Sequence, residues 1–167
     1  MTNRPIADPL PGPHTSALRI LVSRLRAADI LWALTDSTAF ALQGLPIEPG
    51  DIDVQTDEAE AYAIERLFAE HVVRPVRPRN GARITSHFGA LELEGITVEI
   101  MGDIRKRVPA GPWQPPPDLA ALVRWIDWGE LRMPVVPLEY EQHAHAELGR
   151  LDRARQLGDW LSRSRPA

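Results

Sequence analysis

Residues 31–54 read LWALTDSTAFALQGLPIEPGDIDV, and this stretch decides the predicted fold. The apolar run at 30–35 has the length and composition of a buried strand. A turn follows at Asp36 and Ser37, either of which can cap the short helix that AFALQGL predicts. After a loop bounded by prolines, residues 51–55 alternate between polar and apolar side chains, which is the period of a half-buried strand. The predicted order is therefore strand, turn, helix, loop and strand.

Two carboxylates stand two residues apart on the second of these strands. The side chains of Asp51 and Asp53 share one face, because successive side chains of a strand point to opposite faces. Ile52 and Val54 then face the core. A third acid, Glu99, lies in the segment ITVEIMG, on the face opposite to its β-branched apolar residues. If this segment lies beside the first strand, the three acids form one cluster.

An acidic cluster of this kind predicts a divalent-metal site. Three carboxylates packed together repel one another unless a cation lies between them. Hard oxygen ligands suit Mg²⁺ or Mn²⁺, and two such ions can activate an attacking oxygen and stabilise a leaving pyrophosphate. Other interpretations are open at this point, because an Asp-x-Asp pair often stays solvated at the start of a strand and a lone strand glutamate often faces solvent.

The combination resembles the nucleotidyltransferase superfamily, which includes DNA polymerase β and the aminoglycoside and lincosamide nucleotidyltransferases. There, a strand runs into a Gly-Ser turn at a helix start, an Asp-x-Asp strand follows, and a third acid lies on a later strand. The resemblance covers about residues 16–103. It implies an NTP substrate and a catalytic metal site at Asp51, Asp53 and Glu99, with Glu99 as a ligand or as the general base. It also implies that the hydroxyl of Ser37 donates to a phosphate.

Other residues are expected to hold the outgoing phosphates together with Ser37. Thr38 stands at the start of the helix, whose N–H groups suit anions, and Arg105 follows the segment that carries the third acid. Asp36 stands where the superfamily has glycine, which lets the backbone approach the phosphates. An aspartate adds a side chain and a negative charge there. Three interpretations of Asp36 are open. It caps the helix, or it reaches a cation, or it prevents nucleotide transfer in a descendant of the family that still binds a nucleotide or a partner.

The whole chain is predicted to form an α+β (mixed α/β) fold, with a small mixed sheet flanked by helices and a C-terminal helical pair. We expect residues 1–13 to be a disordered or extended arm, residues 14–110 to be the nucleotidyltransferase-like core, and residues 111–167 to pack on that core. Around the motif, we expect a helix from Thr15 or Ser16 to residue 28 and a second helix over 57–71. Four β segments follow over 72–102, divided at Gly81, Gly89 and Gly95, and then a loop over 105–118. The C-terminal part is expected to form a hairpin over 121–136, of which the first part also suits a helix, and helices over 138–148 and 150–161, with fraying from residue 162.

Composition narrows the class of protein. The chain has 167 residues, no cysteine and a formal net charge of −4, so thiolate chemistry and extended DNA binding are not expected. No apolar run approaches the ~20 residues of a membrane span, and we expect a cytoplasmic protein. Basic residues around the predicted β region, among them the only lysine, Lys106, could neutralise a triphosphate or RNA. The histidines show no metal-ligand spacing and are not expected to be catalytic.

These features predict metal-dependent transfer of a nucleoside monophosphate from an NTP to an acceptor that is a small molecule, RNA or protein. The main alternative is a catalytically inactive module that binds a nucleotide or a partner. The segment 137–161 also resembles helices of small bacterial nucleotidyltransferase-like proteins, including relatives of abortive-infection toxins. A toxin is therefore a further alternative, and an antitoxin or a second copy of the chain would be its protein partner.

Overall fold

The computed structural model describes residues 9–164. Within this range the protein has a mixed α/β architecture, in which six α-helices surround one seven-stranded sheet, and this confirms the predicted fold class. The elements are α1 (Gly12–Ala27), β1 (Trp32–Thr35), α2 (Asp36–Leu42), β2 (Ile52–Thr56), α3 (Glu58–Leu67), the 3-10 turn η1 (Ala69–His71), β3 (Val72–Asn80), β4 (Ile84–Leu93), β5 (Ile96–Lys106), α4 (Leu119–Leu122), β6 (Arg124–Trp128), β7 (Leu131–Val135), α5 (Leu138–Glu147) and α6 (Leu151–Ser164).

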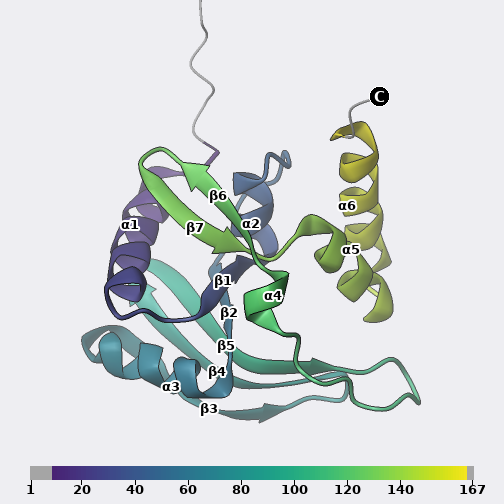
Figure 1. Cartoon of the computed structure of the whole chain (residues 1–167), viewed down its shortest axis with the longest axis horizontal. Helices are drawn as coiled ribbons and strands as arrows, with labels where there is room; N and C mark the ends of the chain where they lie inside the picture. Colours follow the sequence, from purple (N-terminus) through teal and green to yellow (C-terminus); the bar gives the residue numbers. More distant parts are fainter. Residues whose placement is uncertain (1–8, 165–167) are drawn as a thin grey trace, which may run out of the picture.

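The sheet is mixed, with the strand order β3-β4-β5-β2-β1-β7-β6. β2 runs parallel to β5 and β1 runs parallel to β7, whereas the other neighbours are antiparallel. Figure 1 shows α1 and α3 at one end of the molecule and the pair α5 and α6 at the other, above the far ends of β3, β4 and β5. The central pair, β2 and β5, is the one that positions the predicted acids.

One face of the sheet packs against α1 and α3. In α1, Leu18, Leu21 and Leu25 recur at helical spacing and are fully buried. They belong to the same apolar cluster as Ile52 and Val98 of the central strands. Each such side chain contributes about 1.5–3 kcal/mol of transfer free energy, and a slip of one residue would turn it out of the core. The core therefore fixes which side chains β2 and β5 present to the opposite face.

A second apolar cluster holds α5 over that opposite face. Phe40 of α2 packs with Leu138 of α5 and Leu157 of α6. Farther along α5, Tyr140 packs in a third cluster with Ala33 of β1. The C-terminal helices are thus fixed to the sheet by α2 and β1, and α5 becomes the roof of the space described below.

The N-terminal helix starts earlier than expected. α1 begins at Gly12 rather than at Thr15 or Ser16, and Leu10 is only 4% exposed and belongs to the core. Pro11 is the N-cap residue and Pro13 occupies the first turn, where a missing N–H costs no helical hydrogen bond. The prolines that suggested an extended arm therefore start the helix, and the rest of the expected arm, residues 1–8, lies outside the described residues.

The β region has three long strands where four segments were expected. Gly89 does not divide two strands but lies inside β4, where an added Cβ would come 2.7 Å from Cγ2 of Val76 on β3. This glycine permits the close approach of the two strands. β5 also continues through Lys106, so the loop begins later than the expected Arg105.

The C-terminal third contributes to the sheet as well as covering it. The expected hairpin forms as β6 and β7, preceded by the short helix α4. Because β7 pairs with β1, residues 124–135 extend the central sheet and do not form a layer packed on a finished core. α6 continues through Ser164, beyond the position where fraying was expected.

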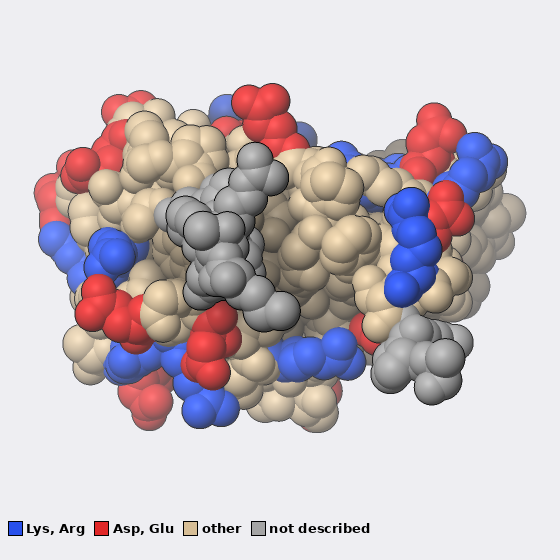
Figure 2. Space-filling view, turned by 90° about the horizontal axis from the view of Figure 1, so that it is seen from above, with Lys and Arg blue, Asp and Glu red and all other residues tan. Residues whose placement is uncertain are grey.

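The surface carries mixed charge. On the face seen in Figure 2, acidic and basic side chains are interspersed around a mostly uncharged centre, and no continuous basic patch is visible outside the grey segments. Within residues 9–164, no helix combines the length and the apolar character needed to cross a bilayer.

Candidate active site

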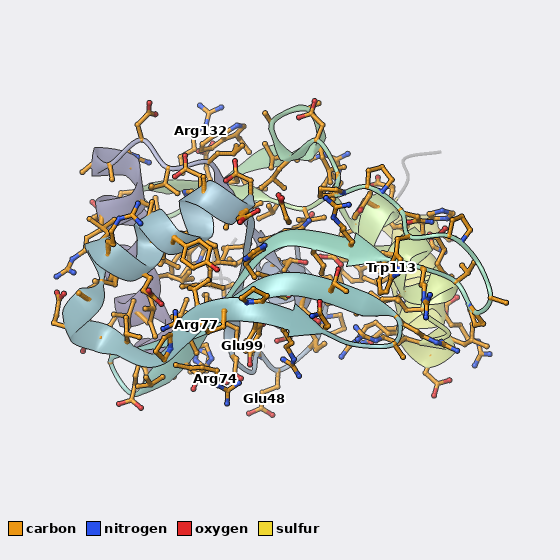
Figure 3. The ribbon with its side chains drawn as sticks, turned by 90° about the horizontal axis from the view of Figure 1, so that it is seen from below. Glu48, Arg74, Arg77, Glu99, Trp113 and Arg132 are labelled. Atoms are coloured by element: carbon orange, nitrogen blue, oxygen red, sulfur yellow. The ribbon has the colours of Figure 1, made fainter. Side chains whose placement is uncertain are left out.

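The register of the central strands brings two of the three predicted acids together. In the parallel pair, Asp53 of β2 lies opposite Glu99 of β5, and the antiparallel neighbour places Thr35 of β1 opposite Asp53. Figure 3 shows Glu99 near the middle of the sheet. Asp53 and Glu99 are therefore side by side on the face away from α1 and α3, which is the juxtaposition that the sequence suggested.

The remaining acids lie at the edge of this pair. Asp51 is exposed just before β2, and Asp36 begins α2 directly after Thr35. Burial raises the pKa of Asp53 to about 9, and the charges of Asp36, Glu99 and Asp51 and a hydrogen bond with Glu99 add to this effect. In the part of the chain that the structure describes, none of the four carboxylates forms an ion pair with a basic side chain. The cluster therefore gathers acidic groups whose charge is not balanced by an ion pair with a basic side chain of the described residues.

Asp36 does not cap its helix, contrary to one of the sequence interpretations. Its φ is +58°, in the left-handed region that favours glycine and that aspartate tolerates better than most residues. Its backbone N–H donates to Oε1 of Glu141 at 3.2 Å, and the hydroxyl of Thr35 donates to the same oxygen. A carboxylate from α5 therefore accepts the hydrogen bond of the first backbone N–H of α2. The positive φ explains why the superfamily resemblance leads to the expectation of glycine at position 36.

Ser37 and Thr38 tie α2 to the loop before β2. Oγ of Ser37 accepts a hydrogen bond from the backbone N–H of Gly50 at 3.0 Å, and the hydroxyl of Thr38 donates to the carbonyl of Asp51 at 3.1 Å. Thr38 is fully buried, so its side chain contacts no ligand in this conformation. Ser37 is half-buried and its hydroxyl still has a proton to donate, so its phosphate role stays a prediction.

The acids line one end of a cavity between the sheet and α5. The cavity measures about 430 Å³. Asp36, Asp53 and Glu99 line it at one end, and Glu141 adds a fourth carboxylate from the roof. Its other end is lined by the basic residues Arg79, Arg83, Lys106 and Arg150, and its middle by apolar side chains that include Phe88, Met101 and Ile104. Asp51, Ser37, Thr38 and Arg105 are outside this lining.

A bulge in β5 decides which of Arg105 and Lys106 faces the cavity. Thr85 pairs with Arg105 and His87 with Gly102, so three steps on β5 face two on β4. Asp103 lies at this point with a φ of +48°. Strict alternation from Glu99 would put Arg105 on the cavity side, but the extra residue reverses the alternation. Arg105 is exposed and outside the cavity lining, whereas Lys106 lines the cavity, and the phosphate role of Arg105 stays a prediction.

Lys106 is held against the roof. Its Nζ lies 4.8 Å from the centre of the Tyr140 ring. Burial lowers the pKa of Lys106, and the carboxylates of Glu141 and Glu147 oppose that shift. The only lysine of the chain is thus a half-buried cation facing the cavity.

The sequence interpretation missed the contribution of α5. Glu141 and His145 are 6% exposed and both line the cavity. Burial raises the pKa of Glu141 and lowers that of His145. Both lie at helical spacing with the buried Leu138 and Ala144. An acid and a histidine on an otherwise apolar helix face were therefore the signal in the sequence that could have indicated a role for α5 in the site.

The family model for aminoglycoside-2''-adenylyltransferases matches residues 17–159, which span the site from α1 to α6. This chain belongs to that family. The match confirms the resemblance to the nucleotidyltransferase superfamily that the motif at 31–54 indicated.

Two solved structures agree with the family assignment. A Thermotoga maritima protein, TM1012, assigned to the nucleotidyltransferases, is 45% identical with a TM-score of 0.80, and the match covers 92% of this chain and 96% of that one. The lincosamide antibiotic adenylyltransferase LnuA, solved with lincomycin bound, is 12% identical with a TM-score of 0.52 and coverage of 85% and 94%, and shares the fold. The search of curated proteins gives no match.

The donor chemistry of this adenylyltransferase-family site suits a divalent cation. Among residues 9–164, no three His, Asp or Glu side chains converge as a ready-made metal site. However, Mg²⁺ usually binds through one or two carboxylates and completes its shell with water and substrate phosphates. Asp53 and Glu99, with Asp51 just before β2, supply hard oxygen donors with excess negative charge. These are the residues that would hold such an ion.

Proposed function

We propose that this protein is a divalent-metal-dependent nucleotidyltransferase that moves a nucleoside monophosphate from an NTP to a hydroxyl of an acceptor. The observation that carries the proposal is the pairing of Asp53 with Glu99 in the cavity, where neither carboxylate forms an ion pair with a basic side chain of residues 9–164. Membership of the adenylyltransferase family supports nucleotide transfer in general and makes ATP the first nucleotide to test.

In this reaction the acceptor oxygen forms a bond to the α-phosphorus while the bond from that phosphorus to the pyrophosphate breaks. Asp51, Asp53 and Glu99 would hold Mg²⁺ or Mn²⁺, which supplies neutralisation of the charge that develops on the phosphates. Glu99 lies next to Asp53 and is suited to take the proton of the acceptor hydroxyl. The hydroxyl of Ser37 is the group of α2 that we propose as a donor to the outgoing phosphates.

The test is transfer of labelled nucleotide by the full chain. Nucleotide binding and pyrophosphate release are measured with each NTP and with Mg²⁺ or Mn²⁺, over acceptors that include an aminoglycoside because of the family name. Asp53→Asn and Glu99→Gln are expected to abolish transfer, and the exposed Glu92→Gln on β4 is the matched control. An absence of NTP binding at every metal concentration, or full activity of Asp53→Asn, would overturn the proposal.

Asp36 supports a second candidate, a member of the family that binds a nucleotide or a partner without transferring. Its carboxylate is among the charges that raise the pKa of Asp53, so it lies close to the proposed phosphate site. A negative charge ~4 Å from a phosphate costs about 1–4 kcal/mol, depending on screening. If this repulsion prevents transfer, Asp36→Gly should bind NTP more tightly than the natural chain. Unchanged affinity in the Asp36→Gly variant would exclude this explanation.

The acceptor class is open in this proposal. Transfer to cellular RNA with arrest of growth on expression, relieved by Asp51→Ala combined with Asp53→Ala, would identify the toxin alternative. Transfer to a small molecule without growth arrest would exclude it.

A further inference from the structure

A histidine of α1 contacts the loop that leads into β2. His14 lies in the first turn of α1 and is only 8% exposed, and its Nε2 lies 2.6 Å from the carbonyl oxygen of Gly50. A carbonyl oxygen only accepts hydrogen bonds, so Nε2 carries the proton and is the donor. Figure 1 shows the start of α1 and the loop after α2 at the same edge of the molecule. α1 is therefore tied to the residue that directly precedes Asp51.

The backbone of Gly50 is held on two sides. Its carbonyl accepts from His14, and its N–H donates to Oγ of Ser37 at 3.0 Å. Glycine has a freer backbone than any other residue, and Gly50 is exposed to solvent, so neither a side chain nor burial restrains it. The two hydrogen bonds supply that restraint. His14 is thus connected to Ser37 through one intervening residue.

The contact with Gly50 directs the hydroxyl of Ser37. A serine hydroxyl has one hydrogen to donate and two lone pairs that accept. Because Oγ accepts from the N–H of Gly50, its own hydrogen must point away from that N–H, and it is available to an anion. If the backbone of Gly50 turned, Ser37 would lose the bond that selects its side-chain rotamer. The orientation of the hydroxyl thus depends on the hydrogen bond from His14 to Gly50.

His14 occupies a position of α1 that suits an apolar side chain. It lies at helical spacing with Leu18, Leu21 and Leu25, which are fully buried in the core. Burial of a polar group is unfavourable unless the group is hydrogen-bonded, and Nδ1 of His14 has no hydrogen-bond partner among residues 9–164. An imidazole is therefore a poor choice for packing alone. What it adds over a leucine at this position is the hydrogen bond to Gly50.

We infer that His14 is a positioning residue of the nucleotide site, which holds Gly50 so that the hydroxyl of Ser37 faces the outgoing phosphates. This inference rests on the proposed function, in which Ser37 donates to those phosphates. His14 contacts no substrate in this assignment and is not a catalytic residue. Its loss should therefore lower the affinity for the nucleotide.

Two variants separate the hydrogen bond from packing. His14→Leu keeps a buried side chain in line with the leucines of α1 but removes the donor, whereas the amide of His14→Gln can still donate to Gly50. The affinity of the full chain for a non-hydrolysable ATP analogue with Mg²⁺ is measured by calorimetry. His14→Leu should bind the analogue about fivefold more weakly, which corresponds to one neutral hydrogen bond, and His14→Gln should recover most of that loss. His143→Leu, which replaces an exposed histidine of α5, is the matched control and should change the affinity less than about twofold.

A double-mutant cycle tests whether His14 acts through Ser37. Ser37→Ala removes the hydroxyl, so adding His14→Leu to this variant should weaken the analogue by less than about twofold further. A role in packing alone would weaken the analogue equally with and without the hydroxyl. A second readout needs no variant: in the natural chain labelled with ¹⁵N, the amide signal of Gly50 and the imidazole signals of His14 should shift together when the analogue binds.

The outcomes distinguish this inference from the function on which it rests. Unchanged affinity in His14→Leu, equal losses in His14→Leu and His14→Gln, or additive effects of His14→Leu and Ser37→Ala would overturn the inference. Unshifted signals of Gly50 and His14 in the analogue-bound natural chain would also overturn it. Failure of the natural chain to bind the analogue at any concentration of Mg²⁺ would contradict the proposed function instead.

Discussion

Asp53→Asn should stabilise the protein in metal-free buffer while abolishing transfer. In the folded chain, burial and the neighbouring acids raise the pKa of Asp53 from 3.8 to about 9. Between these values the unfolded chain has lost the proton and the folded chain keeps it. The folded state therefore binds one more proton, and its free energy of unfolding falls by up to about 1.4 kcal/mol per pH unit as the pH rises.

The magnitude follows from this slope. Stability is fully present below pH 3.8 and declines towards about pH 9. Over three pH units the loss for this group reaches at most about 4 kcal/mol. Asparagine does not ionise, and its amide can donate to Glu99 in place of the shared proton. The free energy of unfolding of Asp53→Asn therefore lacks this decline with pH.

The assay is urea unfolding at pH 5, 6, 7 and 8 with EDTA present. The free energy of unfolding of Asp53→Asn should fall less steeply with pH than that of the natural chain, and Glu92→Gln, which removes an exposed acid, should keep the natural slope. Added Mg²⁺ should narrow the difference between Asp53→Asn and the natural chain, because the cation compensates the carboxylates. Equal slopes for Asp53→Asn and the natural chain, or a variant less stable at pH 8, would refute this reasoning.

Two further predictions concern the groups around the cavity. Glu141→Ala leaves the hydroxyl of Thr35 and the N–H of Asp36 without their acceptor, and should cost about 1–3 kcal/mol in urea unfolding for each group left unpaired, whereas Glu141→Gln should cost less; equal losses would contradict the hydrogen-bond assignment. Asp36→Ala should be less stable than Asp36→Gly by about 1 kcal/mol in thermal unfolding, because alanine is strained at a φ of +58°, and the opposite order would argue against that backbone geometry.

Much of the acidic end could be predicted because it depends on local periodicity. The alternation of Asp51, Ile52 and Asp53 fixes a polar and an apolar face on any strand, and the apolar face must enter the core. Glu99 obeys the same rule on β5. That β2 and β5 are neighbours does not follow from alternation: the sequence left it as a condition, and the superfamily resemblance implied only a third acid on a later strand.

The sequence by itself determined the strand, turn and helix order and the polar faces of two strands, since these depend on residues a few positions apart. Only the tertiary structure decided that Glu141, 105 residues from Asp36, satisfies the start of α2. It also decided that the bulge beside Asp103 turns Lys106 rather than Arg105 into the cavity. Both outcomes depend on how distant segments pair and pack, and a one-residue irregularity in pairing reverses every side chain that follows it along the strand.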